Sequence, residues 1–353
     1  MNITIARDLT VNQNLVAGCY VGDDEVHVRV SDTVTNTRVF EQHYQSGDFR
    51  SLDMLLDRSL LEAGYIPRRI VMAIAGPRQA NGNVRMTHQH EWPLFELGKT
   101  ATRLGVVVET VDDTLATAAG LTVLIPEEQK LLKKGKTDPN GMRLVITLSA
   151  DLGDAILLPN GTSVATKGGR ATWQPMTTLE DRYLKSLRIK YGTTTVTVEE
   201  AIGGAQGFRN LYTFLEREAH RLPNYFKKLY WPDVMLTRHI ESAMLRGKNL
   251  GRIIAGGALA GDPFCRNAMD IFGSILGQYV RNRTLDTMSG GGVYFAGSII
   301  QAEGVADYIV AHTPFLKQLV ANGADAMKAV LIYVVTDSEI AINGAEILAT
   351  KPL

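Results

Sequence analysis

The first half of the chain alternates short β-rich runs with polar turns. Residues 15–21 (LVAGCYV), 25–30 (EVHVRV) and 37–44 (TRVFEQHY) are separated by the turn-forming stretches GDD and SDTVTN. Runs of this length joined by tight turns are typical of consecutive antiparallel strands. The pattern therefore predicts a three-stranded meander.

A helix and a further strand are predicted next. In residues 51–64 (SLDMLLDRSLLEAG) the leucines recur at helical spacing, with Ser51 suited to cap the start and Gly64 to end the helix. Residues 69–77 (RIVMAIAGP) form an apolar run typical of a buried strand. Antiparallel strands followed by a helix and another strand predict an α/β lobe.

The second half begins in a similar way, which predicts a second lobe. Residues 143–150, 154–158 and 162–166 read as strands, and further strands are predicted within 290–300 and 329–336. Long helical segments lie between them: TTLEDRYLKSLRIKYG, GFRNLYTFLEREAHRL and PFCRNAMDIFGSILGQYVRNRTLDT. The charged, turn-rich segment 126–141 is expected to be an exposed loop with a short helix.

Length and composition narrow the class of protein. A chain of 353 residues favours two domains, and its 37 basic and 37 acidic residues give no charge excess that would favour nucleic acid or an anionic membrane. The two cysteines, Cys19 and Cys265, are far apart, which excludes a disulfide framework and fits a reducing cytoplasm. With no signal peptide and no apolar run of roughly 20 residues, we expect a soluble protein with a small ligand.

Four blocks of sequence, in order, resemble the bacterial glucokinases. They are AIAGPRQANGNVRMTHQHEW (73–92), VDDTLATAAGL (111–121), EEAIGGAQGFRNLY (199–212) and GGGVYFAGSII (290–300). The resemblance implies the two-lobed actin-like ATPase (ribonuclease H-like) α/β fold, with a small N-terminal lobe and a larger C-terminal lobe around a cleft. It implies a small lobe at 1–114, joined by 337–353, a large lobe at 115–336, and a homodimer.

Two adjacent carboxylates stand at the corner that carries the family's base. By resemblance, Asp113 takes the proton from the sugar's primary hydroxyl, and Asp112 replaces an asparagine that hydrogen-bonds sugar hydroxyls. Phosphoryl transfer needs one acceptor for that proton besides positioning and charge neutralisation. The alternative is that either aspartate only caps a helix beginning at Thr114, and the two roles are compatible.

The sugar pocket implied by the resemblance is partly changed. Glu200 falls on a family glutamate that reaches the sugar, whereas Lys167 and Arg170 in TKGGRATW (166–173) replace two acceptors with obligate donors. Gly169 still permits close backbone approach. Such a pocket suits a sugar phosphate or acid. Alternatively, both cations are solvated or paired with acidic residues, namely Asp112, Asp113 or Glu200.

The family's phosphate-binding loops are changed more. In the first hairpin, YVGDDEVHVRV (20–30), Gly22 remains of the family's glycine pair and threonine. Asp23, Asp24 and Glu25 would each oppose a phosphate by about 1 kcal/mol even when hydrated, and magnesium offsets only part of this. The second loop, SADLGDA (149–155), keeps Gly153 but introduces two acidic residues, Asp151 and Asp154.

The adenosine-side turn is better preserved. Gly291, Gly292 and Gly297 would let the backbone approach a nucleotide, although a flexible turn before a strand also explains them. In THQHEW (87–92), His88 and His90 lack a third partner at a recognised spacing, so no metal site is predicted.

The resemblance implies ATP-dependent phosphorylation of a hexose, glucose, at its primary hydroxyl, with ATP and Mg²⁺ as cofactors. The changed loops predict that glucose phosphorylation is weak or absent. The alternative is a catalytically inactive relative without cofactors, a binding or regulatory module for a sugar-like anion or an unidentified protein partner.

Overall fold

The computed structural model describes residues 9–22, 24–87, 91–149, 151–220, 238, 240–242, 250–321 and 326–351. Its contacts divide the chain into two units. Unit 1 comprises Met1–Pro126, Asn160–Ala165 and Asp337–Leu353, and unit 2 comprises Glu127–Pro159 and Thr166–Thr336. Among the described helices, none combines the length and apolar character needed to cross a bilayer.

Unit 1 is built on a five-stranded sheet of order β3-β2-β1-β4-β5. The strands are β1 (Val11–Val21), β2 (Glu25–Asp32), β3 (Thr37–Gln45), β4 (Ile66–Ile74) and β5 (Val107–Val111). The helices are α1 (Leu52–Ala63), α2 (Leu97–Leu104), α3 (Asp113–Gly120) and α14 (Ile340–Thr350). The predicted meander is confirmed, since β1 pairs with β2 and β2 with β3, both antiparallel.

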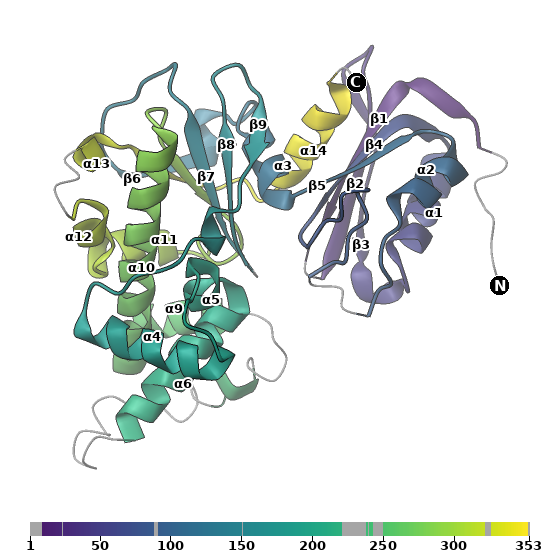
Figure 1. Cartoon of the computed structure of the whole chain (residues 1–353). Helices are drawn as coiled ribbons and strands as arrows, with labels where there is room; N and C mark the ends of the chain where they lie inside the picture. The colour runs from purple at the N-terminus through teal and green to yellow at the C-terminus, as the bar shows by residue number, and fades with distance from the viewer. Residues whose placement is uncertain are drawn as a thin grey trace. The chain divides into compact units, whose positions relative to one another are not determined.

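Alternation along β2 explains the two faces of this sheet. Val26, Val28 and Val30 pack into the core that includes the leucines of α1, whereas His27 and Arg29 lie on the opposite face. Figure 1 shows α1 and α2 on one side of the sheet and α14 on the other. The α1 helix has the predicted ends, because Ser51 accepts a hydrogen bond from Met54 N and Gly64 adopts the left-handed conformation.

Helices α3 and α14 pack closely through glycines. A Cβ added at Gly344 would lie 1.7 Å from the Ala116 carbonyl oxygen, and one added at Gly120 would lie 2.2 Å from that of Ile340. Only residues without a side chain permit this approach. The contacts keep α3, which begins close to the expected lobe boundary at 114, in unit 1 with the C-terminal segment.

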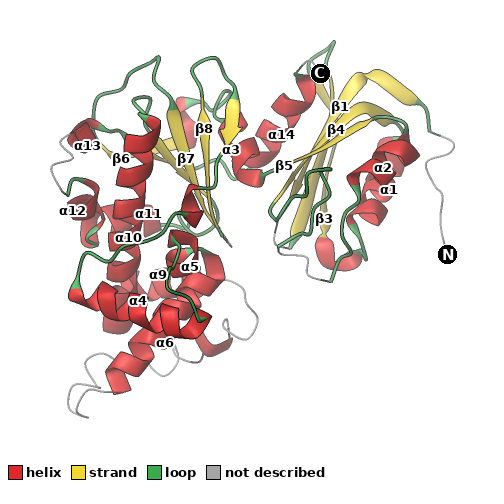
Figure 2. Ribbon diagram, in the orientation of Figure 1, coloured by secondary structure: helices red, strands yellow, loops and turns green. Residues whose placement is uncertain are grey.

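The second sheet has the order β6-β11-β10-β7-β8-β9. Its strands are β6 (Gln129–Lys133), β7 (Arg143–Leu148), β8 (Leu152–Leu157), β9 (Ser163–Ala165), β10 (Val293–Ala296) and β11 (Ile332–Val335). The longer helices of unit 2 are α4 (Thr178–Tyr191), α6 (Gly204–His220), α9 (Leu250–Leu259), α10 (Pro263–Thr287) and α11 (Val305–His312). The shorter ones are η3 (Pro126–Glu128), η4 (Gly168–Arg170), α5 (Val198–Ile202), α12 (Phe315–Leu319) and α13 (Ala326–Ala329). Figure 2 shows α10 against this sheet and α4, α5, α6 and α9 grouped below its strands.

One local prediction was wrong. Part of the expected loop at 126–141 is the edge strand β6, which pairs antiparallel with β11. Its sequence, QKLLK, hides the strand because an edge strand is solvent-exposed and tolerates lysines, which also discourage pairing with other chains.

Candidate functional site

The predicted residues of unit 1 meet at one edge of its sheet. Strands β1 and β5 flank β4 and run parallel to it, and Ala73 of β4 is level with both Tyr20 and Val111. Gly22 and Asp112 follow directly after these two strands. With strands about 4.8 Å apart, the two chain segments lie roughly 10 Å apart, at the carboxyl edge where α/β sheets bind ligands.

Asp112 and Asp113 form the start of α3. Asp112 is the N-cap, and its Oδ1 accepts a hydrogen bond from Thr114 N at 3.2 Å. Asp113 is the first helical residue, and its Oδ1 accepts from the same N–H at 2.8 Å. Both side chains are half-buried. Capping is therefore present, and it holds the Asp113 carboxylate at the sheet edge.

The first hairpin is a tight turn in which the Glu25 carboxylate contacts a neighbouring strand. Gly22 N donates to the Glu25 carbonyl at 2.9 Å, which closes the turn. The Glu25 carboxylate lies 2.6 Å from His43 Nδ1 on β3. Asp24 is exposed, and Asp23 lies outside the described residues. The Glu25 side chain, expected to oppose a phosphate, is thus engaged by a histidine.

Unit 2 presents a corresponding edge at the ends of β7 and β10. These strands are parallel, and Ile299 N donates to the Leu148 carbonyl at 3.0 Å just beyond them. Gly297 has φ +104°, and a Cβ there would lie 2.7 Å from the same carbonyl oxygen. Gly153 pairs with Thr147 at the β7–β8 turn. The structure therefore brings Gly153 and Gly297 to one edge.

Asp154, one of the two acidic residues that the sequence places in the second phosphate loop, is buried and has a cationic partner. It is 3% exposed, and its carboxylate lies 2.7 Å from Nη2 and 2.8 Å from Nε of Arg283. It also accepts from Gly168 N at 2.8 Å and from the Thr166 hydroxyl. A buried ion pair with added hydrogen bonds satisfies this charge. Asp154 therefore anchors the loop that carries Lys167 and Arg170.

The η4 turn presents its cations beside α5. Lys167 and Arg170 are exposed, whereas Gly169 is buried, and a Cβ there would lie 3.0 Å from the Leu152 carbonyl. Hydrogen bonds from Trp173 N to the Val196 carbonyl (2.8 Å) and from Val198 N to the Ala171 carbonyl (3.0 Å) hold the chain after η4 against the start of α5.

Glu199, which sequence reasoning missed, is the glutamate beside these cations. Its Oε2 lies 3.5 Å from Arg170 Nε. Burial raises the pKa of Glu199. The positive charges of Arg170 and Lys167 act to lower this pKa, whereas the negative charge of Asp151 acts to raise it further. Glu200 instead closes a capping box, with Oε2 accepting from Thr197 N at 2.8 Å. The sequence could have distinguished Glu199 from Glu200. A threonine followed three residues later by a glutamate predicts a capping box, which assigns Glu200 to the cap and leaves the Glu199 side chain available.

Gly291 and Gly292 lie at the opposite end of β10 from Gly297, separated from it by roughly 16 Å of strand. A Cβ at Gly291 would lie 2.5 Å from the Gly141 carbonyl, and Gly292 has φ +106°. Close backbone packing and a left-handed turn therefore account for both glycines without a ligand. The structure does not bring them to the edge that holds Gly153 and Gly297.

Comparisons with known proteins agree with this architecture. The glucokinase family model matches residues 21–352. The chain belongs to the glucokinase family. A glucokinase from Nostoc sp. (strain PCC 7120) is 24% identical over 336 residues, which cover 92% of this chain and 94% of that protein.

Solved structures of family members confirm the predicted actin-like α/β fold. The glucokinase from Balamuthia mandrillaris in complex with glucose has a TM-score of 0.71 and 14% identity, covering 96% of this chain and 94% of that one. A ROK family glucokinase from Streptomyces griseus in complex with glucose and AMPPNP has a TM-score of 0.58 and 16% identity, covering 95% and 99%. The family is one of sugar kinases, as the sequence resemblance implied.

Proposed function

We propose that this protein phosphorylates a hexose, with glucose as the first candidate, at its primary hydroxyl with ATP as donor. The observation that carries the proposal is the engagement of the carboxylates expected to repel a phosphoryl donor. Asp154 is neutralised by Arg283, and Glu25 is paired with His43. Arg283 therefore weakens the electrostatic opposition at the second phosphate loop, and the contact with His43 holds the Glu25 carboxylate against β3.

Asp113 is the proposed general base. Its carboxylate is half-buried at the carboxyl edge of the unit 1 sheet, and the start of α3 holds it in place through Thr114 N. A positioned carboxylate accepts the proton of the attacking hydroxyl while the phosphoryl group is transferred, a contribution of about 10²- to 10⁴-fold. Asp112, in its capping position, would hydrogen-bond sugar hydroxyls beside the base.

The proposed sugar pocket in unit 2 offers both donors and acceptors. Lys167 and Arg170 donate, whereas Glu199 accepts, and the ion pair between Arg170 and Glu199 cancels one of the two positive charges. Sugar hydroxyls need both kinds of partner. This balance favours a neutral hexose over the anionic sugar that the two cations alone suggested. Gly169 lets the backbone approach the ligand.

Within unit 2 the proposed nucleotide-binding residues are Gly153 and Gly297 at the edge of the sheet, and within unit 1 the proposed residue is Gly22 of the first hairpin. A relative binds AMPPNP, which is an ATP analogue. Mg²⁺ prefers oxygen ligands, and the carboxylate of Asp151 in the second loop would offer one; when bound, the ion would neutralise phosphate charge. The missing glycine pair and threonine of the first hairpin reduce the donors available to the phosphates, so we expect slow turnover.

The test is a coupled assay of ADP formation with Mg²⁺-ATP and a panel of neutral hexoses, hexose phosphates and sugar acids. Turnover with a neutral hexose supports the proposal. Turnover restricted to anionic sugars would contradict the expected preference for a neutral hexose. A thermal-shift titration with the same ligands runs in parallel, because a ligand that binds only the folded protein raises its melting temperature.

An inactive binding module is the second candidate, favoured by the acidic first hairpin, where Asp24 is exposed. This candidate predicts a thermal shift with sugar or nucleotide but no ADP formation with any sugar of the panel. A ligand that raises the melting temperature and is also turned over supports the kinase, whereas a ligand that raises the melting temperature without ADP formation supports the binding module.

A further inference from the structure

A cluster of histidine and glutamate side chains lies on the α14 side of the unit 1 sheet. In the antiparallel register of β2 and β3, His27 is directly opposite His43, and Arg29 is directly opposite Glu41. Directly opposed side chains on one sheet face are close neighbours. Accordingly, the two imidazole rings stack with centroids 3.7 Å apart, and His27 Nε2 lies 2.8 Å from Glu41 Oε1.

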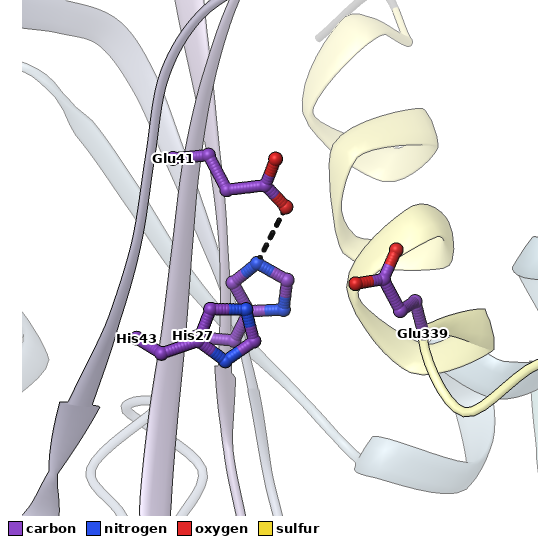
Figure 3. A group of neighbouring side chains, drawn as sticks. All are labelled: His27, Glu41, His43 and Glu339. Atoms are coloured by element: carbon purple, nitrogen blue, oxygen red, sulfur yellow. Dashed lines mark hydrogen bonds and ion pairs between the residues drawn. The ribbon is translucent and has the colours of Figure 1, made fainter.

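Glu339 completes the cluster from the start of α14. One atom each from His27, Glu41, His43 and Glu339 can be chosen so that all four lie within 4.8 Å of one another. Figure 3 shows the Glu339 carboxylate facing the two stacked rings across the space between α14 and the sheet. His27 is 5% exposed, whereas the other three side chains are open to solvent. The cluster therefore has one buried side chain on the sheet and three side chains that an ion from solvent can reach.

The orientation of His43 is fixed by a second carboxylate. His43 Nδ1 lies 2.6 Å from Glu25 Oε1, so the Nε2 side of the ring is directed away from this partner. A histidine whose one nitrogen is held by a carboxylate while the other meets a cation is the usual arrangement in metal sites.

The charges around the cluster leave room for a divalent cation. Among the described residues, three carboxylates pair with two guanidinium groups and a fourth carboxylate pairs with His43, so the carboxylates exceed the guanidinium groups by two. The carboxylates are those of Glu25, Glu41, Glu339 and Glu346, and the cations are Arg29 and Arg38. A divalent cation would cancel this excess of two negative charges.

We propose that His27, Glu41, His43 and Glu339 bind one zinc-class divalent cation. Two imidazole nitrogens and two carboxylate oxygens suit Zn²⁺, which takes four such ligands in a tetrahedron, better than Mg²⁺ or Ca²⁺, which prefer oxygen alone. The site is distinct from the proposed kinase residues and joins α14 to the sheet. Sequence analysis did not find this site because its ligands come from three separate segments, β2, β3 and the start of α14, and do not form a known metal-binding motif.

Metal binding requires a small contraction of the cluster. Ligand atoms about 2.0 Å from a tetrahedral zinc lie about 3.3 Å apart, so separations of up to 4.8 Å must close by up to about 1.5 Å. Rotation of the solvent-exposed Glu339 side chain, together with a tilt of the His43 ring away from its stacked position on His27, would supply this movement. Glu41 would share its carboxylate with Arg29, whose Nε donates to Oε1 at 2.6 Å.

The test is isothermal titration of the chelator-treated full chain with Zn²⁺ alone, together with the visible spectrum after Co²⁺ is added. We expect one equivalent of Zn²⁺ per chain and the absorption bands of four-coordinate Co²⁺. His43→Ala should lower the affinity at least tenfold, because this side chain is a proposed ligand and is 45% exposed, so its removal leaves the core intact. Glu339→Gln should have the same effect.

The control is His312→Ala, which removes an exposed imidazole of α11 in unit 2 and should leave affinity and stoichiometry unchanged. Melting of His43→Ala without zinc at the temperature of the parent protein establishes that this variant is folded. Absence of zinc binding would overturn the proposal, as would binding that survives His43→Ala and Glu339→Gln unchanged.

Discussion

Replacing Gly344 with alanine tests the close packing that supports the proposed base. The added Cβ would lie 1.7 Å from the Ala116 carbonyl oxygen and 2.8 Å from Gly120 N, both on α3. An ordinary contact begins at 3.4 Å, so α3 and α14 must separate by about 1.7 Å or the new methyl must be accommodated by backbone distortion. Because Asp113 is the first residue of α3, the change reaches the site without touching it.

Overpacking of this kind typically costs about 1–3 kcal/mol of unfolding free energy. For a unit of about 150 residues, each kcal/mol lowers the melting temperature by about 2–4 °C, so we expect a decrease of about 2–12 °C. Misplacing a catalytic group by about 1 Å costs up to about 100-fold in rate. Glucose phosphorylation should therefore fall by about 10- to 100-fold, measured as kcat/KM at a temperature where the variant is folded.

The matched control is Gly98→Ala, also a helical glycine of unit 1, where no heavy atom lies within 4 Å of an added Cβ. This variant should change the unfolding free energy by less than about 1 kcal/mol and leave turnover unaltered. Equal melting temperatures and equal turnover for the two variants would refute the proposed coupling between α14 packing and the position of Asp113.

Three further outcomes are expected. Asp154→Asn should cost about 3 kcal/mol in denaturant unfolding, because it removes the buried carboxylate that pairs with the half-buried Arg283 and leaves it, among the described carboxylates, only the longer contact with Asp286; a loss below about 1 kcal/mol would argue against the anchor. Glu199→Gln should raise KM for the sugar and also raise the melting temperature at neutral pH. The pKa of Glu199 is raised by burial, so its ionised form is disfavoured on folding; the gain should shrink as pH falls toward the unfolded value of about 4.3. Glu200→Ala should cost about 1 kcal/mol through the lost capping box with KM unchanged, and a raised KM would return the sugar contact to Glu200.

Local patterns predicted the elements of this fold well. The leucine spacing between Ser51 and Gly64 identified α1 with both of its ends, and the β-rich runs identified the β1–β2–β3 meander. These features depend on neighbours in sequence. The exposed edge strand β6 was missed because its lysines satisfy the rules for a loop as well as for a strand edge.

The candidate site was harder to predict because its chemistry depends on distant partners. Nothing local to Asp154 indicates that Arg283, 129 residues away, neutralises it. Glu199 and Glu200 are adjacent, and only the helix start that Thr197 defines decides which carboxylate is used as a cap. The residues His27 and His43 are separated by a strand and a turn, and only the sheet register makes them neighbours.

The most direct test of the central claim compares glucose-dependent ADP formation by the parent protein, Asp113→Asn and Asp112→Asn. Asparagine caps a helix as well as aspartate does, so Asp112→Asn should remain folded and active. If Asp113 is the base, Asp113→Asn should lose about 10²- to 10⁴-fold in kcat while it still binds glucose and melts near the parent temperature. Equal turnover by Asp113→Asn and the parent protein, or turnover lost only in Asp112→Asn, would contradict the account.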